Sequence, residues 1–212
     1  MSVRLMLAAA FAAIAALTTG ALAAPPPPGP LSAEDRALVD QATAYLDGLG
    51  QAHGHFQQID SRGSVTQGEL FLDRPGKARF DYQSPAALLV VSDGHNVIVH
   101  DRRLKTFDRY PLGATPLALF LQRHVRLDQK VVVTQVDRAP GSFTLTARDG
   151  RKQAQGEIKL TFQAEPIVLR EWSIRDAQGA HTTVRITDLE PTSGLDPALF
   201  VLRNPNPGKG GD

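Results

Sequence analysis

The stretch G-E-L-F-L-D-R-P-G-K-A-R-F-D-Y, residues 68–82, contains an apolar run, residues 70–72, and a second run of alternating side chains, joined by a Pro-Gly turn. In the second run, Ala78, Phe80 and Tyr82 share one face of a strand, and the charged residues between them share the other. Such alternation is typical of an antiparallel strand with one buried and one solvated face. Because residues 73–76 form a turn, the two runs are expected to fold back on each other. The stretch therefore predicts a β-hairpin with one apolar face.

Most of the chain after Gly50 repeats this alternation. Ile158, Leu160 and Phe162, for example, alternate with polar residues, and Asp-Gly pairs separate several of the runs. The expected strands, about ten or eleven in number, span residues 52–60, 64–73, 77–83, 87–92, 96–102, 105–110, 131–138, 142–148, 156–164, 167–176 and 181–189. The fold is therefore predicted to be mainly β, with one antiparallel sheet.

Three helical segments are expected to cover the apolar face of this sheet. Ser32 has the character of an N-cap, and Leu38 and Leu46 follow it at helical spacing. The pairs Thr115-Pro116 and Asp196-Pro197 carry the same kind of start signal before two short apolar runs, residues 117–121 and 197–200. A cover is needed because a large exposed apolar face promotes aggregation.

The N-terminus has the features of a signal peptide. Arg4 precedes the apolar, alanine-rich residues 5–22, and Ala21-Leu22-Ala23 forms a small-residue cleavage site. We expect export and cleavage after about Ala23. The predicted organisation is a signal peptide at 1–23, a Pro-rich spacer at 24–32, a single domain at 33–204 and a flexible tail at 205–212.

Composition excludes several classes of function. The 212 residues include 23 Lys and Arg, 22 Asp and Glu, and no Cys. Without Cys the chain has no disulfide, no thiolate metal site and no cysteine nucleophile. The nearly balanced charge argues against a nucleic-acid partner. Common nucleotide-binding and hydrolase motifs are also missing from the sequence, so we expect neither an enzyme nor a cofactor.

Histidines are the residues that would most readily indicate a metal site or a catalytic site in this sequence. His53 and His55 would project from one strand face, which is half of a metal site, but no third ligand is evident in the sequence. Two solvent-facing histidines on an edge strand are the favoured interpretation, and no metal is expected. An enzyme acting on lipid or glycan remains as an alternative, with His53, Asp60 or His100 as its candidate residues.

The hairpin and its surroundings resemble the periplasmic outer-membrane lipoprotein carriers, the LolA family. The matching segments are residues 56–58, 68–80, 85, 91–94 and 195–200, and their order fits over about residues 33–205. The resemblance implies an unclosed antiparallel β-barrel whose concave apolar face is covered by a lid of three helical segments. It also implies a cavity for the acyl chains of a lipoprotein that travels from the inner to the outer membrane.

The resemblance further implies roles for particular residues. Arg74, in the Arg-Pro pair, would fasten the lid in the empty form. The acyl-chain cavity would be lined by Leu70, Leu72, Ala78, Phe80, Tyr82, Leu89 and Val91. The lid would present Leu38, Leu46, Leu117, Phe120, Leu121, Leu199 and Phe200.

The implied partners are lipoproteins, an inner-membrane lipoprotein-releasing ABC transporter and an outer-membrane lipoprotein receptor, with the carrier itself a monomer. The chain departs from the family where Ala78 replaces a frequent aromatic and where residues 204–211 replace a final apolar strand. A paralogous protein that binds or senses another lipid or amphiphile on the same scaffold is therefore the alternative.

Overall fold

The computed structural model describes residues 30–115, 117–121, 131–149, 156–175 and 179–204. The expected signal peptide with its cleavage site, most of the Pro-rich spacer and the tail at 205–212 lie outside the described residues. Within the described part of the chain, no helix is long and apolar enough to cross a membrane.

Eleven strands make up most of the described chain. They are β1 (Gln51–Ile59), β2 (Val65–Asp73), β3 (Lys77–Tyr82), β4 (Leu88–Asp93), β5 (Asn96–Asp101), β6 (Thr106–Pro111), β7 (Val131–Ala139), β8 (Ser142–Asp149), β9 (Glu157–Gln163), β10 (Val168–Arg175) and β11 (His181–Pro191). The helical segments are α1 (Ala33–Gly48), η2 (Leu112–Ala114), α2 (Leu117–Leu121) and η3 (Pro197–Phe200). The mainly-β prediction is confirmed, and each strand lies within about two residues of its expected bounds.

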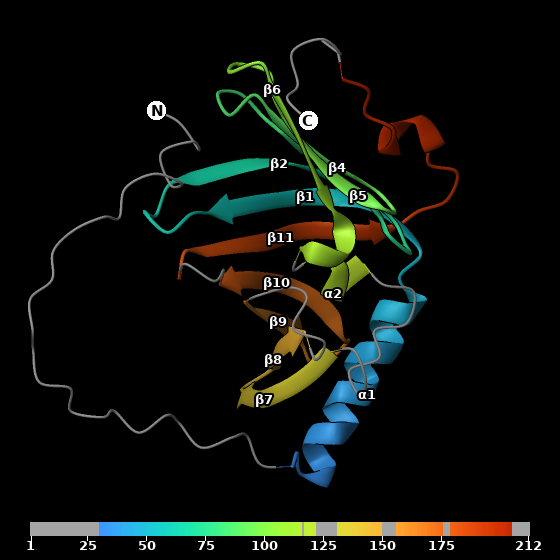
Figure 1. The fold of residues 1–212 in the computed structure, drawn as a ribbon. Helices are drawn as coiled ribbons and strands as arrows, with labels where there is room; N and C mark the ends of the chain where they lie inside the picture. Colours follow the sequence, from blue (N-terminus) through green and yellow to red (C-terminus); the bar gives the residue numbers. More distant parts are fainter. Residues whose placement is uncertain (1–29, 116, 122–130, 150–155, 176–178, 205–212) are drawn as a thin grey trace, which may run out of the picture.

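All eleven strands belong to one antiparallel sheet in the order β6-β5-β4-β3-β2-β1-β11-β10-β9-β8-β7. The sheet is open, because β6 and β7 stand at the two ends of this order. Figure 1 shows the sheet bent around α2, with α1 running along the half that contains β7 to β10. β1 lies at the centre, between β2 and β11, so the prediction that His53 and His55 occupy an edge strand is wrong.

Helix α1 begins where the sequence predicts. The Ser32 side chain accepts a hydrogen bond from the Asp35 backbone N–H at 3.0 Å, which satisfies one of the free donors of the first turn. Val39, Ala42 and Leu46 recur at helical spacing on one side and are buried against the sheet. Most of the stability of α1 therefore comes from packing.

The predicted lid of three helical segments is wrong for the described residues, since α1 is the only helix longer than two turns. α2 has five residues, and η3 is a four-residue 3-10 turn on the convex side of the sheet, against β3 and β4. In η3 the Asp196 carboxylate accepts a hydrogen bond from the Ala198 N–H, so the predicted start of this segment is confirmed. Local capping does not determine which face of a sheet a segment covers, and this segment covers the convex one.

Candidate functional site

Aromatic rings from distant parts of the chain meet at the centre of the concave face. Phe56 on β1 packs edge-on against Phe80 and Tyr82 on β3, with ring centroids 5.4 and 5.0 Å apart. Phe80 in turn contacts Trp172 on β10 at 6.0 Å. Phe120 of α2 stacks on Trp172 at 5.4 Å with an interplanar angle of 20°. The short helix α2 therefore fills the middle of an aromatic surface made by three strands.

Aliphatic side chains surround these rings. Leu70, Leu72 and Ala78 are fully buried, and Phe80 and Tyr82 are nearly so, all in one core cluster. The structure thus places five of the predicted cavity residues together on the concave face. Tyr82 keeps its hydroxyl satisfied by donating to Gln58 Oε1 at 2.6 Å, and burial raises the pKa of its phenol.

Leu89 and Val91 lie on the other face of the sheet. Phe80 pairs with Val90, whereas Val91 pairs with Arg79 and Leu89 with Asp81, on the charged face of β3. Paired residues in an antiparallel ladder share a face, so the cavity role predicted for Leu89 and Val91 is wrong. Their neighbours Leu88 and Val90 pack against the concave core instead.

Arg74 lies where the hairpin of β2 and β3 meets both helices. Its guanidinium carbon is 5.7 Å from the centroid of the Phe120 ring, a cation–π arrangement. Burial lowers the pKa of Arg74, and the nearby carboxylate of Asp47, in the last turn of α1, opposes that shift. Two residues further on, the Gly76 N–H donates to the Leu121 carbonyl of α2 at 2.7 Å. The Arg-Pro turn is thus joined to α2 by a backbone hydrogen bond and by the Arg74–Phe120 contact.

Among the other predicted lid residues, those of α1 and α2 do cover the concave face. Leu46, Phe120 and Leu121 are buried in its core, and Leu38 and Leu117 are partly buried against it. At its start, α1 is tied to β7: Arg138 contacts Glu34 at 3.0 Å and Asp35 at 2.6 Å. Hydrogen bonding from Ser32, with help from Arg138, lowers the pKa of Asp35 despite some desolvation.

The remaining two, Leu199 and Phe200, do not belong to a lid over this face. The Leu199 carbonyl accepts a hydrogen bond from Arg79 at 3.2 Å, and the Phe200 ring lies 5.9 Å from Lys77 Nζ. Lys77 and Arg79 alternate with the concave residues of β3, so both contacts are on the convex face.

The candidate residues for enzyme chemistry are not brought together. Asp60 accepts hydrogen bonds from the backbone of its own turn, at 2.8 and 2.9 Å, and His100 packs beside Phe107. His53 approaches Glu69 at 3.4 Å and His55 binds Asp188 at 3.0 Å. No group of His, Asp and Glu residues arranged to hold a metal occurs within the described ranges.

Two central residues, Phe56 and Trp172, were not in the predicted cavity set. Phe56 stands in a regular alternation with Ala52 and Gly54, which was the available signal. For Trp172 the signal is broken, because the β10 register shifts between Leu169 and Glu171. A bulge inserts an extra residue, so Leu169 and Trp172 both face the core although they are three positions apart.

Comparison with known proteins gives the family of this chain. A model of the family described as outer membrane lipoprotein carrier protein LolA matches residues 47–203. An outer-membrane lipoprotein carrier protein of Chromobacterium violaceum is 26% identical over 196 residues, covering 89% of this chain and 92% of that protein. One from Chromohalobacter salexigens is 27% identical over 177 residues, covering 80% of each. A solved LolA superfamily protein from Nitrosomonas europaea aligns with a TM-score of 0.47 and 7% identity, over 79% of this chain and 97% of that one. Since the family model matches well over half of its residues, this chain belongs to the LolA family of outer membrane lipoprotein carrier proteins.

Proposed function

We propose that this protein is a periplasmic carrier that holds the acyl chains of lipoproteins against its concave face on the way from the inner to the outer membrane. The observation that carries the proposal is the position of Phe120. This ring fills the centre of an apolar surface, yet it belongs to a helix of only five residues. A helix so short has little stability of its own, so it can move aside at modest cost. Its departure would uncover Trp172 and Phe80 for an acyl chain.

A movable cover is one way to meet the energetics of lipid transport. A sixteen-carbon acyl chain has about 14 methylenes, worth roughly 11 kcal/mol at about 0.8 kcal/mol each when fully buried. A carrier that gained this whole amount would not release its cargo. The free energy needed to displace α2 offsets part of the gain, so release to an acceptor becomes possible. Nothing in the sequence predicts nucleotide binding, so the driving energy would be supplied by a partner.

Arg74 is the proposed latch of the empty form. Its contact with Phe120 and the hydrogen bond from Gly76 to Leu121 hold α2 against the hairpin, while Asp47 favours the charged state of the guanidinium. A desolvated cation–π contact is worth about 1–2 kcal/mol. Loss of the Arg74 contact should therefore raise the population of the open form roughly 5- to 30-fold.

This role is tested with Arg74→Leu. We expect the variant to bind an apolar fluorescent dye roughly 5- to 30-fold more tightly than the wild type, and to deliver lipoprotein cargo to acceptor vesicles more slowly. Arg79→Leu is the matched control, because Arg79 lies on the next strand but faces the convex side. The latch would be contradicted if dye affinity and cargo delivery were unchanged in Arg74→Leu. It would also be contradicted if the two variants changed them equally.

The proposed partners are a lipoprotein-releasing ABC transporter in the inner membrane as donor and a lipoprotein receptor in the outer membrane as acceptor, with the carrier acting as a monomer. Depletion of the protein should then leave outer-membrane lipoproteins at the inner membrane. Cell fractionation followed by immunodetection of lipoproteins measures this.

A second candidate is a paralogue that binds or senses another amphiphile. The fully buried Ala78 favours it, because a small side chain at this point of the concave face changes the shape available to cargo. Mass spectrometry of lipid that co-purifies from the periplasm separates the two candidates. A triacylated peptide supports the lipoprotein carrier, and any other lipid supports the paralogue.

A further inference from the structure

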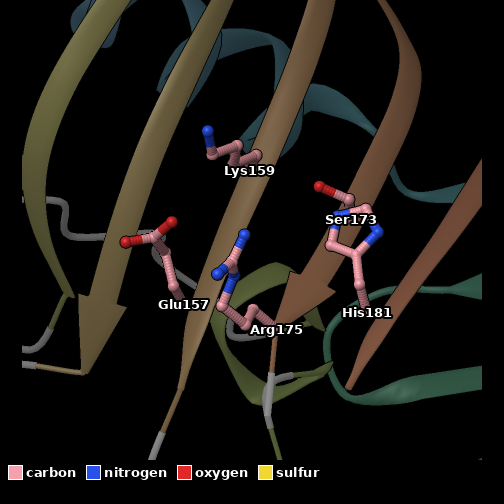
Figure 2. Close-up of a pocket in the computed structure, with 5 residues that line it drawn as sticks. All are labelled: Glu157, Lys159, Ser173, Arg175 and His181. Atoms are coloured by element: carbon pink, nitrogen blue, oxygen red, sulfur yellow. The ribbon is translucent and has the colours of Figure 1, made fainter. Parts of the chain in front are cut away.

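A small polar pocket lies on the convex face, away from the concave core. It measures about 60 Å³ and is lined by Glu157, Lys159, Ser173, Arg175 and His181 (Figure 2). These residues come from the neighbouring strands β9, β10 and β11. The strand register places them side by side, since Ser173 pairs with Lys159, and Arg175 pairs with both Glu157 and His181. The pocket is therefore built by the sheet itself.

Its charge is predominantly positive. The one carboxylate, that of Glu157, is bound by Arg148 from β8, with its Oε2 at 2.9 and 3.2 Å from two guanidinium nitrogens. Lys159 and Arg175, by contrast, have no ion pair within the described part of the chain. Arg148 thus neutralises the acidic member, and two cations and an imidazole remain among the side chains that line the pocket.

The donor set matches a particular kind of ligand. A guanidinium offers a planar fork of N–H donors, an ammonium offers three more, and a serine hydroxyl and an imidazole N–H complete the set. Ser173, only 8% exposed, is the most buried of the residues that line the pocket. A row of lysines and arginines on a flat strand face would simply be solvated, but here both cations line a hollow that a buried serine also lines. The volume exceeds the roughly 10–15 Å³ that a single ordered water needs.

We propose that this pocket binds a tetrahedral phosphate group. Two sources carry that chemistry, a soluble phosphate and the headgroup of a phospholipid. In either case the site is separate from the acyl-chain surface, because its residues alternate with the concave residues Ile158, Leu160 and Trp172 on the same strands. A headgroup bound here would come from a membrane that the convex face touches, with the cargo surface directed elsewhere.

The first arm of the test uses inorganic phosphate. Backbone amide and imidazole NMR signals of residues 157–159, 173–175 and His181 are followed during titration with sodium phosphate against sodium chloride at equal ionic strength. We expect saturable shifts with phosphate and none with chloride. In Arg175→Gln we expect the affinity for phosphate to fall about tenfold. Arg185→Gln is the matched control: it removes the same charge from the same face, but Arg185 is held by Glu171 at 2.8 Å outside the pocket.

The second arm uses vesicles of phosphatidylglycerol and of phosphatidylcholine in a flotation assay. Binding to phosphatidylglycerol that Arg175→Gln abolishes and Arg185→Gln retains supports the pocket with a headgroup as ligand. Phosphate shifts without vesicle binding support it with a soluble ligand. Absence of binding in both arms, or equal losses in the two variants, overturns the proposal. Circular dichroism spectra of the wild type and the two variants should match, which excludes misfolding as the cause of lost binding.

Discussion

At Gly68 the backbones of β2 and β3 leave no room for a side chain. A Cβ placed there would overlap the backbone carbonyl of Asp81 on the paired strand. We therefore expect Gly68→Ala to destabilise the protein by about 2–4 kcal/mol, because one of the two strands must shift. Urea denaturation measures the change. Gly48→Ala is the control, since no atom beyond its chain neighbours and its own helix backbone lies within 4 Å of the added Cβ. Equal stability of the two variants would contradict the steric argument.

The face of the sheet that a residue occupies is predictable from the sequence in some strands and not in others. Ala78, Phe80 and Tyr82 could be assigned to one face because charged residues alternate with them, whereas Leu70 and Leu72 are separated by Phe71 and were placed by the family resemblance. The run Leu88-Leu89-Val90-Val91 has no such alternation, so either set can face the core. Both faces are in fact shielded there, because Leu89 and Val91 are buried on the convex side outside the main core cluster. Composition cannot resolve a strand that is buried on both faces.

For whole elements, the bounds are predictable from the sequence, but the face of the sheet that a segment covers is not. The eleven strands were predictable because alternation and turn residues are local signals, and so was the start of α1 at Ser32. The position of η3 was not predictable, since the Asp196 cap determines where the turn starts and says nothing of which face it meets. The convex location depends on Lys77 and Arg79, which are more than a hundred residues away in sequence.

A histidine–aspartate pair joins β1 and β11 along the boundary between these two strands, called the seam below. Its register shifts between His55 and Phe56, and the Asp188 carboxylate accepts hydrogen bonds from the His55 backbone N–H and ring, both at 3.0 Å. The side-chain hydrogen bond, aided by the opposite charge, raises the pKa of His55 and lowers that of Asp188. The pair thus stabilises the seam when the imidazole is protonated and the carboxylate ionised.

The sign of the pH dependence follows from these two shifts. The His55 contribution is complete below its unfolded pKa and is lost as pH rises through its raised folded pKa. The Asp188 contribution is present above its unfolded pKa and is lost as pH falls through its lowered folded pKa. We expect Asp188→Asn to bring the His55 pKa, measured by NMR, back toward its ordinary value. The stability deficit of the variant should be largest at mildly acidic pH and shrink above neutrality. A deficit that is constant with pH would contradict this account.

In the whole molecule, the bend of the sheet places α2, a helix of five residues, at the centre of the concave side. Strands from both halves of the chain curve around α2 (Figure 1), and Phe120 touches Trp172 from one half and Arg74 from the other. α1 is attached at its start to β7 through Arg138 and lies near Arg74 at its end through Asp47. Under the proposed mechanism, displacement of α2 alone would uncover the apolar surface, while α1 would keep its own attachments.

Trp172 makes this opening measurable, because it is the only tryptophan in the chain and is 2% exposed. If acyl chains replace Phe120 on its ring, a lipopeptide with brominated acyl chains should quench Trp172 emission on binding, since bromine quenches at close range. Arg74→Leu should reach the same quenching at a lower ligand concentration, because its α2 is already loosened. The same peptide without acyl chains serves as the control and should leave the emission unchanged. Binding of the brominated lipopeptide without quenching would place the acyl chains away from the concave face, and would refute both the proposed site and the role of α2 as its cover.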